Sequence, residues 1–241
     1  MMKFVEVLKR KMKDNLGTRT PIIAFLGDSV TQGVFEVYQK DDKMQVVFDS
    51  CATYSEKVKE ILALLYPQAP VSIMNAGVNG SSAPEGFERL KRDVLPFSPD
   101  LLVVCFGLND SNGEEDGIET YKDALRQIFR TAREAGIETI FMTPNMMNTD
   151  SSKVSPGSIL EPLAELFAKR QNEGVFDAYM DAARRVCAEE EIVVCDCYAI
   201  WENMYECGVD TTNLLSNGLN HPTKELHFLF AYELVKTILQ K

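Results

Sequence analysis

The stretch that decides the fold is IIAFLGDS, residues 22–29, in which five apolar residues run directly into Gly-Asp-Ser. A short, continuous apolar run of this kind is typical of a strand that is buried on both faces of a sheet. Further segments have the same strand-like composition, and they lie at residues 71–74, 101–106, 137–142 and 192–195. We therefore expect residues 22–26 to form the first strand of a parallel sheet.

Helical patterns separate these strands. Apolar residues recur about every 3.6 positions around residues 58–65 and again over 118–132. Near the C-terminus the same spacing places five apolar residues on one predicted helix face: Phe228, Tyr232, Val235, Ile238 and Leu239. Right-handed crossovers put such helices on both sides of a parallel sheet. The predicted fold class is therefore α/β, a three-layer α/β/α sandwich with a central five-stranded parallel sheet.

The chain of 241 residues is long enough for one α/β domain and too short to require two. We interpret residues 1–241 as a single domain in which residues 1–20 form an N-terminal helical extension, because Phe4, Val5 and Leu8 fall at helical spacing. Scattered charge and the lack of an apolar centre argue against a signal peptide there. No stretch reaches the length of a membrane span, so we expect a cytoplasmic protein without a membrane partner.

Acidic residues outnumber basic residues by 36 to 25, which gives a net charge of −11. Nucleic-acid binding needs clustered Lys and Arg to neutralise phosphates, so this balance argues against a nucleic-acid partner. The six cysteines are expected to be free thiols, since Cys105 and Cys195 lie in apolar runs. The Cys-x-Cys at 195–197 lacks the additional ligands that zinc requires. We therefore predict no metal site and a reducing compartment.

Two connections are unusually long for a compact domain. Residues 34–50 follow the first strand, and residues 144–162 are rich in Ser, Pro, Asn and Met. Loops of this length are commonly functional, so we expect both to form walls or lids of a substrate cleft. The methionines of the second segment suit either an adaptable acyl pocket or simple core filling.

Polar residues gather where three of the predicted strands end, at 27–29, 75–77 and 107–110. In open parallel sheets ligands bind at that edge. The chain has only two histidines, so a hydroxyl nucleophile with an imidazole base would depend on His221 or His227. His221 precedes the last helix on a loop that can reach the sheet edge, whereas His227 lies inside that helix.

Four segments resemble, in order and spacing, the signature blocks of the SGNH hydrolases, also called GDSL esterases and lipases. They are GDSVTQG at 27–33, NAGVNGSS at 75–82, GLND at 107–110 and NHP at 220–222. The resemblance runs from about residue 21 to residue 235. It implies a flavodoxin-like fold and the hydrolysis of carboxylic esters, a reaction that in this family needs no metal and no organic cofactor.

The resemblance also implies roles for single residues. Ser29 matches the nucleophile and His221 the base that takes its proton. The oxyanion hole would consist of the Ser29 N–H, the Gly80 N–H and the Asn109 side chain. Gly77 is a rival for the role of Gly80, and Asn109 is alternatively a helix cap.

The last block departs from the family pattern, which places an Asp three residues before the base. Gly218 occupies that position, and Asn217 is the nearest polar substitute. Three explanations remain open. A backbone carbonyl or Asn217 orients His221 in a Ser-His dyad; Asp210 folds back to supply the carboxylate; or the protein is a weakened enzyme that only binds its ligand.

The leading functional hypothesis is a serine esterase or deacylase that hydrolyses short-chain carboxylic esters, with O-acetyl groups on a carbohydrate as the expected substrate. A lipase or thioesterase-type acyl hydrolase and an acyltransferase use the same residues. A ligand-binding homologue that lacks the triad Asp is the alternative from another class. The expected partner is a small-molecule or carbohydrate ester, and the oligomeric state is left open, with a homo-oligomer as one option.

Overall fold

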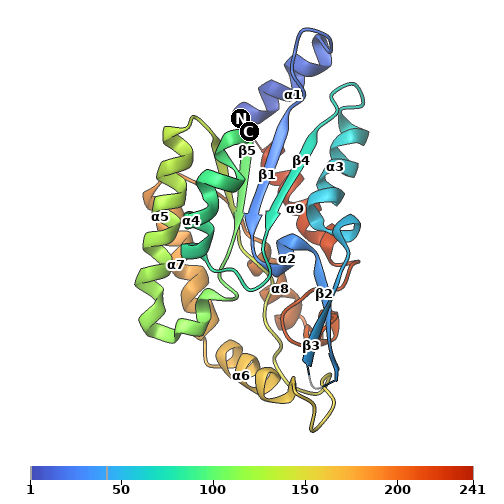
Figure 1. Cartoon of the computed structure of the whole chain (residues 1–241), viewed down its shortest axis with the longest axis vertical. Coiled ribbons are helices and arrows are strands. Elements are labelled where there is room, and N and C mark those ends of the chain that lie inside the picture. Colours follow the sequence, from blue (N-terminus) through green and yellow to red (C-terminus); the bar gives the residue numbers. More distant parts are fainter. Residues whose placement is uncertain (1, 42, 241) are drawn as a thin grey trace.

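The computed structural model describes residues 2–41 and 43–240, and its centre is a parallel sheet of five strands (Figure 1). Across the sheet the strand order is β4-β1-β5-β6-β7, and all neighbours run parallel. The strands are β1 (Ile22–Gly27), β4 (Ser72–Gly77), β5 (Leu101–Cys105), β6 (Glu138–Met142) and β7 (Val193–Cys195). The predicted fold class is confirmed. Because the chain turns in opposite directions from β1 to reach β4 and β5, the ends of these three strands border the topological switch point.

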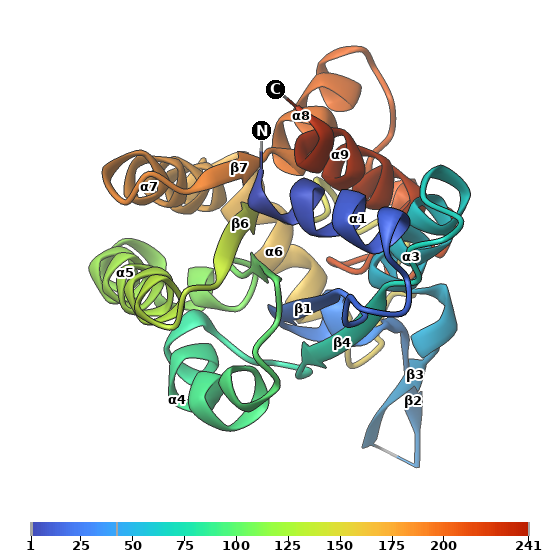
Figure 2. The same cartoon turned by 90° about the horizontal axis from the view of Figure 1, so that it is seen from above.

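Helices cover both faces of the sheet (Figure 2). One face carries α4 (Ala83–Asp93), α5 (Ile118–Glu134) and α7 (Val175–Glu189). The other carries α3 (Tyr54–Leu65) and α9 (His227–Leu239), with α8 (Cys197–Glu206) and α1 (Lys3–Lys13) beside α9. The predicted N-terminal helix is present, and its Phe4, Val5 and Leu8 are buried in the main core.

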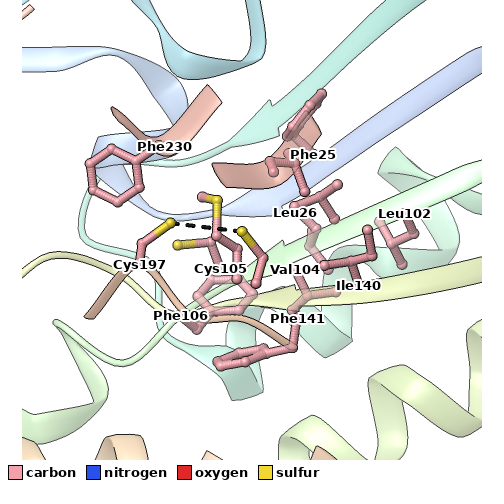
Figure 3. Close-up of a cluster of buried hydrophobic side chains, with 14 of the residues drawn as sticks. Phe25, Leu26, Leu102, Val104, Cys105, Phe106, Ile140, Phe141, Cys197 and Phe230 are labelled. Carbon is pink, nitrogen blue, oxygen red and sulfur yellow. Dashed lines mark hydrogen bonds between the residues drawn. The ribbon is translucent and has the colours of Figure 1, made fainter. Parts of the chain in front are cut away.

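The main core lies between the sheet and these helix layers. Residues 23–26 of β1 are fully buried, as the continuous apolar run predicts. Figure 3 shows part of this core, and its Phe25, Val104, Phe141, Cys105 and Cys197 all belong to one buried hydrophobic cluster. Full burial of one aromatic or aliphatic side chain contributes about 1.5–3 kcal/mol to the stability of the fold. The many buried side chains of the main core therefore hold the strands in fixed positions. All six cysteines are free, as predicted.

The prediction for the face of the last helix was partly wrong. Phe228, Tyr232 and Leu239 of α9 are 48%, 66% and 38% exposed. The buried stripe begins one residue earlier, at His227, and continues through Phe230, Ala231, Leu234, Val235 and Ile238. Both sets satisfy helical spacing, and tertiary contacts decide between them: the His227 ring packs against Phe35 and Tyr54, which fixes the rotation of the helix.

The two long connections differ from each other. Residues 34–50 are largely an antiparallel hairpin, β2 (Val34–Lys40) and β3 (Lys43–Phe48), rather than an irregular loop. The hairpin lies near the carboxyl ends of the central strands (Figure 1). Residues 144–160 are mostly irregular and lead into α6 (Glu161–Asn172), yet residues 144–148 are buried and Met147 joins the main core. These methionines therefore fill the core.

Short 3-10 helices complete the described part of the chain: η1 (Ser50–Ala52), η2 (Leu95–Phe97), η3 (Asp110–Gly117) and η4 (Thr212–Leu214). Among residues 2–41 and 43–240, no helix combines the length and the apolar character needed to cross a membrane.

Candidate active site

Ser29 stands directly beyond the buried end of β1. A Cβ atom on Gly27 would lie 2.7 Å from the Cys105 carbonyl oxygen, so only glycine lets β1 and β5 approach this closely. Asp28 then caps the short helix α2 (Ser29–Gln32), because its Oδ1 accepts from the Val30 N–H at 2.9 Å. The strand end and the cap together fix Ser29 as the first residue of a helix at the sheet edge.

His221 meets Ser29 across 192 positions of sequence: its Nε2 lies 2.9 Å from Ser29 Oγ. The other ring nitrogen, Nδ1, lies 3.3 Å from the Phe35 carbonyl oxygen. A carbonyl can only accept, so Nδ1 carries the proton and Nε2 presents its lone pair to the Ser29 hydroxyl. This arrangement can move a proton from the serine to the histidine.

Both side chains are shielded from solvent, with Ser29 3% and His221 5% exposed. Burial lowers the pKa of His221 to about 4, and the hydrogen bond to Phe35 only partly opposes this effect. The imidazole is therefore neutral at pH 7, which is the form that can accept a proton.

Neither predicted side-chain partner reaches the imidazole ring. Asn217 Oδ1 accepts from the backbone N–H groups of Leu219, Asn220 and His221, each at 3.0 Å, so Asn217 fixes the backbone of the histidine loop instead of the ring. Asp210 is exposed. Its carboxylate accepts hydrogen bonds from the backbone N–H and the side-chain Nδ2 of Asn213. The ring-orienting role expected of Asn217 or Asp210 is corrected accordingly: the acceptor at Nδ1 is the backbone carbonyl of Phe35.

The segment after β6 supports the same loop, and sequence reasoning missed these residues. Asn145 Nδ2 donates to the Asn220 carbonyl at 2.9 Å, and the Asn148 N–H donates to the Leu219 carbonyl at 2.8 Å. Both asparagines are buried. Their signal was a fourth polar cluster at the end of a strand, inside the stretch that we interpreted as a lid.

The candidate oxyanion donors lie on three neighbouring strand ends. Asn109 follows β5, and its Nδ2 donates to the Ser81 carbonyl at 3.0 Å, which joins the second and third polar clusters. The Ser29 N–H is the first amide of α2 and therefore has no acceptor within its own helix. Gly80 lies in an exposed turn with a φ of 77°, a conformation that favours glycine. Its rival Gly77 is already engaged, because its N–H donates to Asn75 Oδ1 at 2.9 Å.

Two buried carboxyl groups flank this region. Burial raises the pKa of Asp28 to about 7 and that of Asp110 to about 6, and repulsion from Asp110 adds to the shift at Asp28. One oxygen of Asp110 accepts from the Ala83 N–H at 2.8 Å. The Oδ2 atoms of both residues have no hydrogen-bond partner among the described residues. Near neutral pH these carboxyls thus carry less negative charge than exposed aspartates.

Arg89, on α4, lies at the carboxyl ends of β1 and β4. Its guanidinium donates to the Gly27 carbonyl at 2.7 Å and also to the Ala76 carbonyl, which ties the ends of β1 and β4 together. A groove of about 480 Å³ opens beside it, lined by Val78, Asn79, Gly80, Ser81, Glu85, Glu88, Arg89 and Arg92. The lining is mainly polar and charged, and it includes the turn of Gly80.

Known proteins share both the sequence pattern and the fold. The GDSL-like Lipase/Acylhydrolase family matches residues 25–228. Over 132 residues the chain is 24% identical to an acetylxylan esterase from Geobacillus stearothermophilus, and this alignment covers 51% of the chain and only 58% of that relative. The solved structure of an acetylxylan esterase from the same organism superposes with a TM-score of 0.67 at 18% identity, covering 92% of this chain and 95% of that chain. A lipase/acylhydrolase from Enterococcus faecalis gives a TM-score of 0.65 at 22% identity, with coverages of 90% and 95%.

Ser29 and the neutral His221 thus lie side by side at the switch point of the parallel sheet, where the imidazole can accept the hydroxyl proton. The chain belongs to the GDSL-like lipase/acylhydrolase family.

Proposed function

We propose that this protein is a serine esterase for short-chain carboxylic esters, with O-acetyl groups on a carbohydrate as the substrate. The observation that carries the proposal is the line of contacts from Ser29 Oγ through the His221 ring to the Phe35 carbonyl. It supplies a hydroxyl, a neutral base and a fixed tautomer, which are the parts that a serine nucleophile requires.

In the proposed reaction Ser29 Oγ attacks the ester carbonyl while His221 Nε2 takes the hydroxyl proton. The tetrahedral oxyanion is stabilised by the N–H groups of Ser29 and Gly80 and by the Asn109 side chain. His221 then gives its proton to the leaving alcohol, which frees the alcohol and leaves an acyl-serine. Water, deprotonated by the same histidine, hydrolyses that intermediate and restores Ser29.

Two observations support a short acyl group on a polar alcohol. The nucleophile is almost fully buried, which favours a small acyl group at this position. The groove beside Gly80 is lined by polar and charged side chains, which suit a polyhydroxy alcohol better than an alkyl chain. The acetylxylan esterase among the relatives adds support for this substrate class. Turnover of acetylated xylo-oligosaccharides well above that of octanoyl esters is expected, and the reverse order would favour a lipase-type hydrolase.

Fluorophosphonate labelling tests the nucleophile directly. Intact-protein mass spectrometry should show one stoichiometric adduct on the wild-type protein and none on Ser29→Ala, because only an activated hydroxyl attacks phosphorus at a useful rate. Ser55→Ala is the matched control, since Ser55 is also buried but bonds to Thr53 and Asn75 instead of a histidine. A folded wild-type protein that forms no adduct would make the silent ligand-binding homologue the better explanation.

The pH profile should reflect the shielded base. With the pKa of His221 near 4, the ring stays neutral and active as pH falls, and it is protonated only as pH drops through about 4. An unperturbed histidine would instead lose activity around pH 6.5. We expect kcat/KM for a neutral acetyl ester to change less than about threefold from pH 7 to pH 5, measured in the range where circular dichroism shows a folded protein. An acid limb centred near 6.5 would contradict this expectation.

A further inference from the structure

We propose that Ser216 is a positioning residue for His221, acting through the carbonyl group of Phe35. The inference rests on the proposed function, because it concerns the base of the same site. It names the side chain that holds the neutral acceptor in the place where the family pattern puts a carboxylate.

The hydroxyl of Ser216 points at the acceptor of the catalytic ring. Ser216 Oγ lies 2.6 Å from the Phe35 carbonyl oxygen, and longer contacts of 3.1 Å and 3.4 Å reach the carbonyls of His221 and Pro222. A serine hydroxyl has one proton to donate, and the shortest of the three contacts is the one to Phe35. The Phe35 oxygen thus accepts from Ser216 and from His221 Nδ1 at the same time.

The backbone around Phe35 leaves this carbonyl open for that use. Phe35 is the second residue of β2, and the pairing of β2 with β3 is irregular between Val34 and Val37. Phe35 has no partner in the register of the hairpin, which pairs Val34 with Phe48 and next Val37 with Val46. The two side-chain contacts of this carbonyl, with Ser216 Oγ and His221 Nδ1, both come from outside the hairpin.

The turn around the histidine does not need the Ser216 hydroxyl for its own closure. The Ser216 N–H donates to the His221 carbonyl at 2.7 Å, and the Thr223 N–H donates to the Leu214 carbonyl at 2.9 Å. These backbone hydrogen bonds close the turn without the Ser216 hydroxyl. The hydroxyl instead reaches an element 181 positions earlier in the chain and couples the hairpin to the histidine.

This coupling matters because the acceptor at Nδ1 is uncharged. A carboxylate attracts the imidazolium that forms during the reaction through its full charge. A carbonyl contributes only a dipole, so the stabilisation it gives depends on the direction in which the C=O bond points. Loss of the Ser216 hydroxyl would let the Phe35 carbonyl turn away, and the ring would then lose both its orientation and the bond that fixes its tautomer.

Proton NMR and steady-state kinetics of Ser216→Ala test the inference. In the wild-type protein we expect a downfield, exchange-protected signal from the Nδ1 proton of His221, assigned by its loss in His221→Ala. In Ser216→Ala this signal should broaden or vanish, and kcat for an acetyl ester should fall about tenfold with KM unchanged, since orientation rather than binding is lost. Ser216→Thr retains the hydroxyl and should recover kcat to within about threefold.

Ser155→Ala is the matched control, because Ser155 lines the same surface cavity as Ser216 but no hydrogen bond links its side chain to Phe35 or His221 among the described residues. It should leave kcat and the Nδ1 signal unchanged.

If Ser216→Ala does not fold, Ser216→Cys replaces it, since a thiol fills the space but donates weakly. A folded Ser216→Ala or Ser216→Cys with wild-type kcat and an intact Nδ1 signal would overturn the inference, as would the lack of a protected Nδ1 proton in the wild type. Failure of the proposed function would give a different result: the wild-type protein would form no fluorophosphonate adduct.

Discussion

His221→Ala is expected to lower kcat/KM for acetyl esters by about 10⁴-fold or more, the size of loss seen when the base of a serine hydrolase is removed. The base is the only histidine nitrogen within hydrogen-bond distance of Ser29 Oγ in the described part of the chain. Without it the serine hydroxyl has no acceptor for its proton. The measurement is kcat/KM with acetylated xylo-oligosaccharides and with an aryl acetate, together with the rate of fluorophosphonate labelling, which should fall in parallel.

The chain contains a matched control for this substitution in its second histidine. His227 is also buried, but its Nδ1 accepts from the Tyr54 N–H at 2.9 Å, which holds α3 against α9. His227→Asn should therefore lower the free energy of unfolding by about 1–3 kcal/mol and leave kcat of the folded protein within about threefold of the wild type. Equal losses of kcat in the two variants would show that the effect of His221→Ala comes from disturbed packing.

Much of the fold and part of the site could be predicted from local patterns. The run at 22–26 is apolar at every position, which is typical of a strand covered on both faces, and the structure buries it almost completely. Ser29 and Asn109 follow strand ends, where the parallel sheet brings them to one edge whatever the connecting helices are. His221 could be singled out because the sequence offers only two histidines, and His227 was predicted to lie inside the last helix whereas His221 precedes it on a loop.

The rest of the site depends on groups that leave no mark in a sequence. The acceptor of the His221 ring is a backbone carbonyl, and every residue has one, so nothing distinguishes Phe35 until the hairpin is folded. The hairpin itself was missed because a bulge-like irregularity follows Val34 and interrupts the strict alternation that predicts a strand. The roles of Asn145 and Asn148 likewise arise only when the segment after β6 lies against the histidine loop.

We propose that these groups, together with Asn217, compensate for Gly218 at the position of the family's aspartate. In place of a charged partner at Nδ1, the histidine loop is held by many hydrogen bonds. Asn217 accepts from three backbone N–H groups of this loop, and the segment after β6 donates to two of the loop's carbonyls. A neutral acceptor at Nδ1 avoids the cost of burying a carboxylate next to a side chain that is itself almost fully buried.

Asn109→Ala is expected to lower kcat by about 10²–10³-fold with little change in KM, the loss that follows removal of one oxyanion donor. The Asn109 amide has two protons, and the hydrogen bond to the Ser81 carbonyl uses one of them, which aims the group and leaves the second for the oxyanion. Its contribution therefore appears only when negative charge develops on the substrate. The measurement is the separate effect on kcat and on KM for an acetyl ester.

Asn109→Asp separates this role from simple support of the Gly80 turn. The aspartate has the same shape, but it lacks both protons and adds a negative charge where the oxyanion forms. Its kcat should therefore fall below that of Asn109→Ala. Asn79→Ala serves as a control for the turn. The backbone N–H of Asn79 donates to the Gln32 side chain, and the substitution leaves this hydrogen bond in place. If Asn109 only held the turn, both substitutions would raise KM and leave kcat near the wild-type value, because substrate placement and not charge stabilisation would be lost.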